Sequence, residues 1–238
     1  MTESSYSQLR NSRVAAALIG GTALIGAVLV THHPVVARTE GDPGYPFGGL
    51  AAIMQTNLTF HGILMLVVTG QFLGLFLFAR RLGVHRLWVL AGLLLCSFAA
   101  ILLIIAMTFD GFVVYELISR CSASSPGCGK GTEDALRLSL AIIQGFTKLG
   151  FAAQCLGFMT LGGAMWTLGG RVRIAAVAAV SAAAIPIVMI SSGAYVGPQQ
   201  LMEILTLLGG WSLCVAAVLI METVPFANNR AAASPVGS

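Results

Sequence analysis

The residues of this chain most able to do chemistry are ionisable side chains that interrupt long apolar stretches. Lys148 lies inside the apolar stretch Ala135–Leu168, one helical turn after Gln144. A charge at the centre of a membrane helix costs about 2.5–3.5 kcal/mol even on lenient insertion scales. We therefore expect a carboxylate partner for this lysine, either Asp110 or Glu116. The pair is either an anion-binding or proton-coupled site or a structural ion pair, unless the lysine extends along its stem to the membrane surface.

Other polar side chains are expected at a similar depth. A helix rises about 1.5 Å per residue, which puts them in the outer half of a bilayer or at its rim. This one-sided distribution predicts a polar pocket that opens outward. The predicted binding residues are Lys148, Gln144, His61, Asp110, Glu116 and Glu203.

Three of the polar residues are of metal-ligand type. His33, His61 and Asp110 offer two ring nitrogens and a carboxylate, which with one open position suit zinc, copper or non-haem iron. No sequence spacing links them, so only the packing of three different helices can bring them together. A haem between His61 and either His33 or His32 is a further alternative. The sequence indicates neither cofactor strongly, and histidines satisfied by water or lipid headgroups are the plainer interpretation.

The composition excludes a water-soluble fold. Of the 238 residues, 57% are hydrophobic and only 9% are charged, and the mean hydropathy is +0.88, whereas soluble domains carry about 25% charged residues. Six apolar stretches are about long enough to cross a hydrocarbon core of about 30 Å. We therefore predict an all-α polytopic membrane protein, a bundle of six transmembrane helices. The predicted spans are Val14–Thr31, Leu50–Ala79, Leu87–Phe109, Ala135–Leu168, Ile174–Ser192 and Leu201–Thr223.

The distribution of arginine predicts the orientation. If the six spans are correct, eight arginines lie on one side, and seven acidic residues with four basic ones lie on the other. The positive-inside rule then places both termini in the cytoplasm, in a cell membrane and most simply a bacterial inner membrane. Residues 1–227 are expected to form one transmembrane domain, and residues 228–238 a short disordered cytoplasmic tail. The basic residues form only short clusters beside the membrane, so nucleic-acid binding is not expected.

Two features concern processing. Cys121 and Cys128 share the predicted outer loop around a Pro-Gly turn, which predicts a disulfide in an oxidising compartment. Arg10 and Arg13, an apolar stretch and then Val35-Val36-Ala37 have the layout of a secretory signal peptide. The apolar stretch is long for that purpose, so a retained anchor is favoured over cleavage, and both interpretations stay open.

Small residues predict close helix packing. Gly70-x-x-x-Gly74 and Ala17-x-x-x-Gly21 form faces that allow helices of this chain, a protein partner or a second copy to approach closely in the bilayer. Three function classes follow from the sequence. The first is a protein that binds or moves a small solute, an ion or a proton. The others are an accessory or scaffold subunit of a larger complex and a membrane-embedded metal- or haem-dependent enzyme. Whether the protein is a catalyst at all stays open.

Overall fold

The computed structural model describes residues 3–33, 47–122, 130–170, 172–193 and 196–221, and these residues form only helices and their connections. Six helical runs among them are long and apolar enough to cross a membrane. The structure is therefore compatible with an integral membrane protein, as predicted. The elements are α1 (Glu3–Thr31), α2 (Phe47–Leu82), α3 (Leu87–Thr108), a π-helical turn η1 (Phe109–Val113), α4 (Val114–Ser122), α5 (Lys130–Trp166), α6 (Val172–Ser191) and α7 (Pro198–Ile220).

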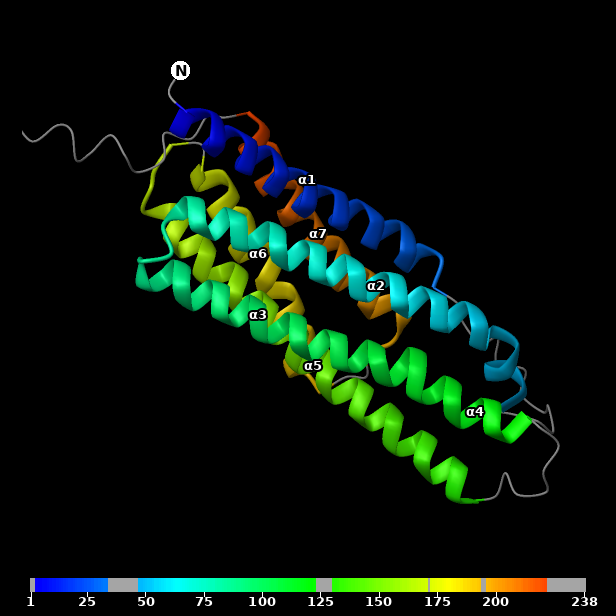
Figure 1. Ribbon diagram of the computed structural model, residues 1–238. Helices are drawn as coiled ribbons and strands as arrows, with labels where there is room; N and C mark the ends of the chain where they lie inside the picture. Colours follow the sequence, from blue (N-terminus) through cyan, green and yellow to red (C-terminus); the bar gives the residue numbers. More distant parts are fainter. Residues whose placement is uncertain (1–2, 34–46, 123–129, 171, 194–195, 222–238) are drawn as a thin grey trace, which may run out of the picture.

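The long helices form a closed ring (Figure 1). Each of them packs against its neighbours in the sequence, in the order α1, α2, α3, α5, α6 and α7, and α1 packs against α7 to close the ring. The connections between α2 and α3 and between α5 and α6 are only a few residues long, which forces the paired helices to run antiparallel. At the first of these turns Gly83 has a φ of +96°, a conformation that favours glycine.

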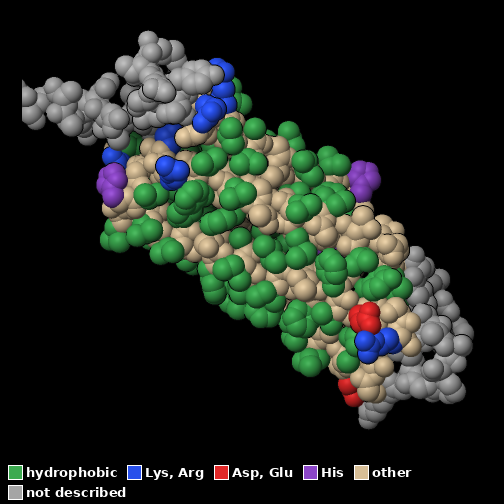
Figure 2. Space-filling model, viewed as in Figure 1, with side chains coloured by type: hydrophobic (Ala, Val, Ile, Leu, Met, Phe, Trp, Pro, Cys, Tyr) green, Lys and Arg blue, Asp and Glu red, His purple; other side chains and the backbone are tan. Residues whose placement is uncertain are grey.

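Charge distinguishes the two ends of the ring (Figure 2). Basic side chains gather at the end where α1 and α3 begin, which we call the basic end, and acidic side chains lie at the opposite end, the acidic end. The α2–α3 and α5–α6 turns lie at the basic end, and α2 and α5 begin at the acidic end (Figure 1). The described charged residues in these two groups are Arg10, Arg13, Arg80, Arg81, Arg86 and Arg173 at the basic end, and Glu116, Glu133 and Asp134 at the acidic end, where Arg120 and Arg137 pair with Glu116 and Glu133.

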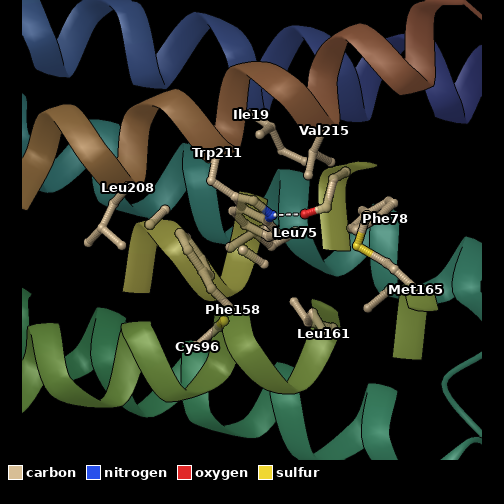
Figure 3. Close-up of a cluster of buried hydrophobic side chains, with 14 of the residues drawn as sticks. Ile19, Leu75, Phe78, Cys96, Phe158, Leu161, Met165, Leu208, Trp211 and Val215 are labelled. Atoms are coloured by element: carbon tan, nitrogen blue, oxygen red, sulfur yellow. Dashed lines mark hydrogen bonds between the residues drawn. The ribbon is translucent and has the colours of Figure 1, made fainter. Parts of the chain in front are cut away.

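The half of the ring nearest the basic end is filled by side chains. Phe158 and Trp211 are almost completely buried, with ring centroids 3.9 Å apart. The indole N–H of Trp211 donates a hydrogen bond of 3.0 Å to the backbone oxygen of Ala175 (Figure 3). Ile19 and Phe78 pack in the same cluster. This half of the bundle therefore has a continuous core shared by all six long helices.

The two small-residue faces differ in what they contact within the chain. A Cβ added at Gly74 would lie 2.7 Å from Cγ1 of Ile19, so α1 and α2 approach closely at this glycine. On α1, however, Ala17 is exposed and nothing lies within 4 Å of a Cβ at Gly21. Gly20, one residue earlier, lies on the face that packs against α7, where its added Cβ would be 3.0 Å from Cβ of Ala216.

The end predicted for the third span is wrong. We expected it to end at Phe109 and residues 110–134 to form a loop, but the helical run continues through η1 and α4 to Ser122. The reason is a second apolar cluster near the acidic end, where Val114 and Ile118 pack with Ile143 of α5. Polar residues on the other side of α4 gave these positions the composition of a loop. Cys128 and residues 222–238 lie outside the described residues, so the predicted disulfide and the predicted tail stay predictions.

Candidate metal centre

The site begins with a buried histidine on α2. His61 is only 4% exposed, and its Nδ1 lies 2.9 Å from the backbone oxygen of Asn57, four residues earlier on the same helix. A carbonyl oxygen can only accept, so Nδ1 carries the hydrogen of this bond. This leaves Nε2 as the ring atom that faces the rest of the site. Histidine ligands of metals usually donate their second ring N–H to a carbonyl or carboxylate in this manner.

The π-helical turn supplies the carboxylate. Asp110 lies in η1, and its Oδ2 is 3.1 Å from Nε2 of His61. The side-chain amide of Asn57 donates a bond of 3.1 Å to the backbone oxygen of Asp110. Single π-helical turns occur frequently at functional sites, because the extra residue redirects the side chains around it. Asn57 therefore supports both neighbours, the histidine through its own carbonyl and the aspartate through its amide.

A glycine makes the approach of η1 to α2 possible. Gly111 follows Asp110 and is buried, and a Cβ added there would lie 2.6 Å from Cβ of His61. Such a distance is shorter than real contacts allow, so any larger residue requires the two helices to separate. Gly111 thus sets the distance between the aspartate and the histidine.

The third candidate ligand comes from the end of α1. The ring of His33 contacts His61 edge to face, with centroids 5.6 Å apart, and contacts Phe60 in the same manner at 4.7 Å. One ligand atom each from His33, His61 and Asp110 lies within 4.8 Å of the other two. The structure therefore brings together the three residues that no sequence spacing linked.

The distances fit a small metal ion. Metal–ligand bonds of about 2.0–2.2 Å put the ligand atoms of a tetrahedral site roughly 3.3 Å apart. The His61–Asp110 distance of 3.1 Å already matches this value, and His33 has to approach by at most about 1.5 Å. Two nitrogens and one oxygen leave a fourth position for water or a ligand. A haem fits less well, because Asp110 lies in the direction in which Nε2 of His61 would bind its iron.

A cavity of about 150 Å³ extends from this centre into the bundle. His33, His61 and Asp110 line one end, and Gln71 and Gln154 line the other. The walls come from α1, α2, α3, α5 and α7 and are mainly apolar between the two ends; they include Val30, Leu64, Val67, Leu103, Met107, Phe151 and Leu205. The three candidate ligands are therefore at the end of an apolar cavity that runs between the helices.

Two predicted binding residues, Gln144 and Lys148, contact the backbone between α6 and α7. Gln144 makes two bonds of 3.1 Å to the backbone of Val196, one from its amide nitrogen and one to its oxygen, and so ties α5 to the segment before α7. Lys148 donates to the backbone oxygen of Gly193 at 3.4 Å. The expected pairing of Lys148 with Asp110 or Glu116 is absent from the ion pairs of the described residues, because these two acids bind His61 and Arg120.

The remaining predicted residues lie outside the cavity wall. Glu116 is exposed and pairs with Arg120 one helical turn later at 2.8 Å. Glu203 is exposed and accepts a long bond of 3.5 Å from Gln199. His32 is exposed, and its Nδ1 lies 2.8 Å from the backbone oxygen of Val28. Of the six predicted binding residues, the structure thus places His61 and Asp110 in the cavity wall.

Sequence reasoning missed three contributors to the site. Asn57 lies four residues before His61, on the same helical face. Gly111 carries no side chain that suggests a role. Gln154 is buried in the cavity wall, and no hydrogen bond from its side chain occurs among the described residues. Only the spacing of Asn57 and His61 was a usable signal.

Comparison with known proteins adds no further information about this site. No protein-family model, curated protein or solved structure matches the chain.

Proposed function

We propose that this chain is an integral membrane protein that binds a divalent transition-metal ion, zinc above all, through His33, His61 and Asp110. The observation that carries the proposal is that ligand atoms from three separate helical segments converge within 4.8 Å. The bond from Nδ1 of His61 to the carbonyl of Asn57 supports it, because it orients the ring with Nε2 toward the ion. The mixed nitrogen and oxygen donor set favours zinc or copper over magnesium or calcium.

The closed core near the basic end supports binding rather than passage. The cavity ends at Gln71 and Gln154, and beyond it Phe158 and Trp211 fill the centre of the ring. A solute that enters from the acidic end therefore meets packed side chains halfway along the bundle. A water molecule or ligand in the fourth coordination position of the metal would face the apolar cavity.

The charge distribution supports an outward-facing site. The arginines at one end of the bundle favour the cytoplasmic side. Because α1 begins and α7 ends at this basic end (Figure 1), both termini would be cytoplasmic. The metal centre lies in the half of the bundle nearer the acidic end and would open to the exterior of a cell membrane.

The test is metal binding by the purified full chain. Protein reconstituted in lipid nanodiscs is titrated with zinc, and cobalt is used as a coloured substitute that reports tetrahedral geometry. We expect one ion per chain, and we expect His61→Ala and Asp110→Ala to abolish binding because each removes a ligand and its partner's contact. His33→Ala removes only one ligand and is expected to weaken binding without abolishing it.

The chain offers a matched control for the histidines. His32→Ala removes an exposed imidazole next to His33, and it should leave the zinc affinity unchanged. Asp110→Asn keeps the shape of the side chain and serves where Asp110→Ala does not fold. Absence of zinc binding by the wild-type protein, or equal binding by the His61 and His32 variants, contradicts the proposal and favours a scaffold role.

Proton transfer is the second candidate function. Both ring nitrogens of His61 face oxygen acceptors, the carbonyl of Asn57 and the carboxylate of Asp110. A neutral imidazole has only one N–H, so either an extra proton or a metal ion must lie between Nε2 and the carboxylate. If wild-type protein binds no metal, pH-dependent infrared difference spectra of wild-type and Asp110→Asn protein test whether the pair holds that proton.

A further inference from the structure

The cavity has polar groups at both of its ends. At one end are His61 and Asp110, and at the other are Gln71 and Gln154. Between them α5 contributes Thr147 and Phe151, which lie on the same face of the helix as Gln154. An apolar cavity with polar groups at both ends matches a ligand that has an apolar chain with a polar group at each end.

Gln154 is the second observation that points to a ligand. It is 91% buried, since its exposed fraction is 9%, and it lines both this cavity and a smaller adjoining one. Gln71 donates to the hydroxyl of Ser212 at 3.1 Å, but Gln154 has no hydrogen-bond partner among the described residues. A buried amide without a partner is strongly unfavourable, so something that enters the cavity must satisfy it.

We propose that the cavity binds a single-chain amphipathic lipid whose oxygen-donor head ligates the metal and whose far end carries a hydroxyl or carbonyl bound by Gln154. The proposal rests on the metal-binding function for its head group. The walls between the two ends recognise the chain through apolar contact. The amide of Gln154 recognises the far end, because it offers both donors and an acceptor to a hydroxyl or carbonyl.

The helix geometry sets the length of the ligand. His61 and Gln71 are ten residues apart on α2, which corresponds to about 15 Å along the helix axis. An extended chain advances roughly 1.2 Å per bond, judging from the reach of an extended polypeptide. A linear chain of about ten to twelve carbons therefore spans the distance between the two polar ends. A longer chain would have to leave the cavity between the helices.

The test compares two fatty acids that differ only at the far end. Dodecanoate and ω-hydroxydodecanoate are titrated calorimetrically into the zinc-loaded protein in lipid nanodiscs, with empty nanodiscs as the correction for partition into lipid. We expect the ω-hydroxyl to raise the affinity roughly threefold to tenfold, the usual yield of one buried hydrogen bond. In Gln154→Met, which keeps the volume of the side chain but removes the amide, this preference should disappear.

Matched variants separate the lipid proposal from the metal proposal. Gln199→Met makes the same substitution at an exposed position outside the cavity and should keep the preference for the hydroxyl. Zinc affinity should be equal in wild type and Gln154→Met, which also shows that the variant is folded. Gly209→Leu fills the cavity from α7, where nothing lies within 4 Å of an added Cβ, and should weaken both fatty acids alike.

Two results would overturn the lipid proposal. One is equal affinity of the wild-type protein for the two fatty acids, and the other is a hydroxyl preference that persists in Gln154→Met. A protein that binds no zinc but keeps a preference dependent on Gln154 supports the lipid site and refutes the metal site. A protein that binds zinc but shows no preference for the ω-hydroxyl supports the metal site and refutes the lipid site.

Discussion

The two halves of the helical ring differ in what fills their centre. Toward the basic end, large side chains such as Phe158 and Trp211 occupy the space between the helices. Toward the acidic end, α1, α2, α3, α5 and α7 surround a cavity of about 150 Å³ with the candidate metal centre at one end of it. The difference shows that one bundle can hold both a filled core and a cavity, because each helix presents different residues along its length.

The comparison predicts that large side chains matter most in the filled half. Trp211→Ala removes a fully buried indole and leaves a void, so we expect a loss of about 3–5 kcal/mol in the free energy of unfolding. Val67→Ala in the cavity wall should lose under about 1.5 kcal/mol, because the methyl groups removed there contact an existing space. Unfolding by sodium dodecyl sulfate in mixed micelles measures both values, and similar losses at the two sites would refute the distinction.

Replacing glycine with alanine tests the same difference by adding a methyl group to each half of the bundle. A Cβ at Gly157 would lie 2.6 Å from Sγ of Cys96, so Gly157→Ala should destabilise the protein by about 1–3 kcal/mol. At Gly26 the nearest atom is Cγ1 of Val67 at 3.7 Å. Gly26→Ala should therefore be neutral or more stable by up to about 1 kcal/mol. The same unfolding assay applies, and a tolerated Gly157→Ala contradicts close packing of α3 on α5.

In the half with the cavity, supporting residues should affect binding more than folding. Gly111→Ala forces η1 away from His61, and Asn57→Ala removes the donor to the backbone oxygen of Asp110. Loss of such support typically lowers metal affinity about tenfold to hundredfold. Zinc titration measures the effect, and Thr59→Ala, an exposed position on the same helix, is the control. An unchanged affinity in both variants means that the three ligands do not act together.

The smallest effect is expected at Lys148. Its contact with the backbone oxygen of Gly193 is long, at 3.4 Å, and the residue does not line the cavity. Lys148→Met should change the free energy of unfolding by no more than about 0.5 kcal/mol, as for most surface positions. Zinc affinity should be unchanged. A large loss of zinc affinity would restore the interpretation of this lysine as a binding residue.

The number and approximate positions of the long helices could be predicted well from the sequence, because a helix that crosses a bilayer needs about 20 consecutive apolar residues. The six long helices agree with the six predicted spans to within several residues at most ends. The end of the third span could not be predicted, because Val114 and Ile118 are buried only by contact with another helix. The helical face that α1 presents to α7 was also missed by one residue, since Ala16 and Gly20 directly precede Ala17 and Gly21 and have the same spacing.

The site could be predicted in part. The chemistry of His33, His61 and Asp110 and their similar predicted depth made them a candidate metal-ligand set. From the sequence, Lys148 is the stronger candidate for a functional residue, because a charged residue inside an apolar stretch is more unusual than a histidine or an aspartate near its end. Three-dimensional packing reverses that ranking: Lys148, in the middle of α5, reaches the backbone oxygen of Gly193 in the turn after α6, while His61 is buried. Depth can be calculated from the sequence, but the direction in which a side chain faces cannot.

The π-helical turn η1 changes the direction in which side chains project on its two sides. Its extra residue offsets the side chains on either side by about 100° from the register of an uninterrupted helix. The α3 segment can therefore hold its contacts with α5 while α4 turns a different face to its neighbours. Substitutions that change the packing of α4 can therefore leave the packing of α3 in the ring unchanged. A single insertion or deletion at η1 would change the direction in which the Asp110 carboxylate points.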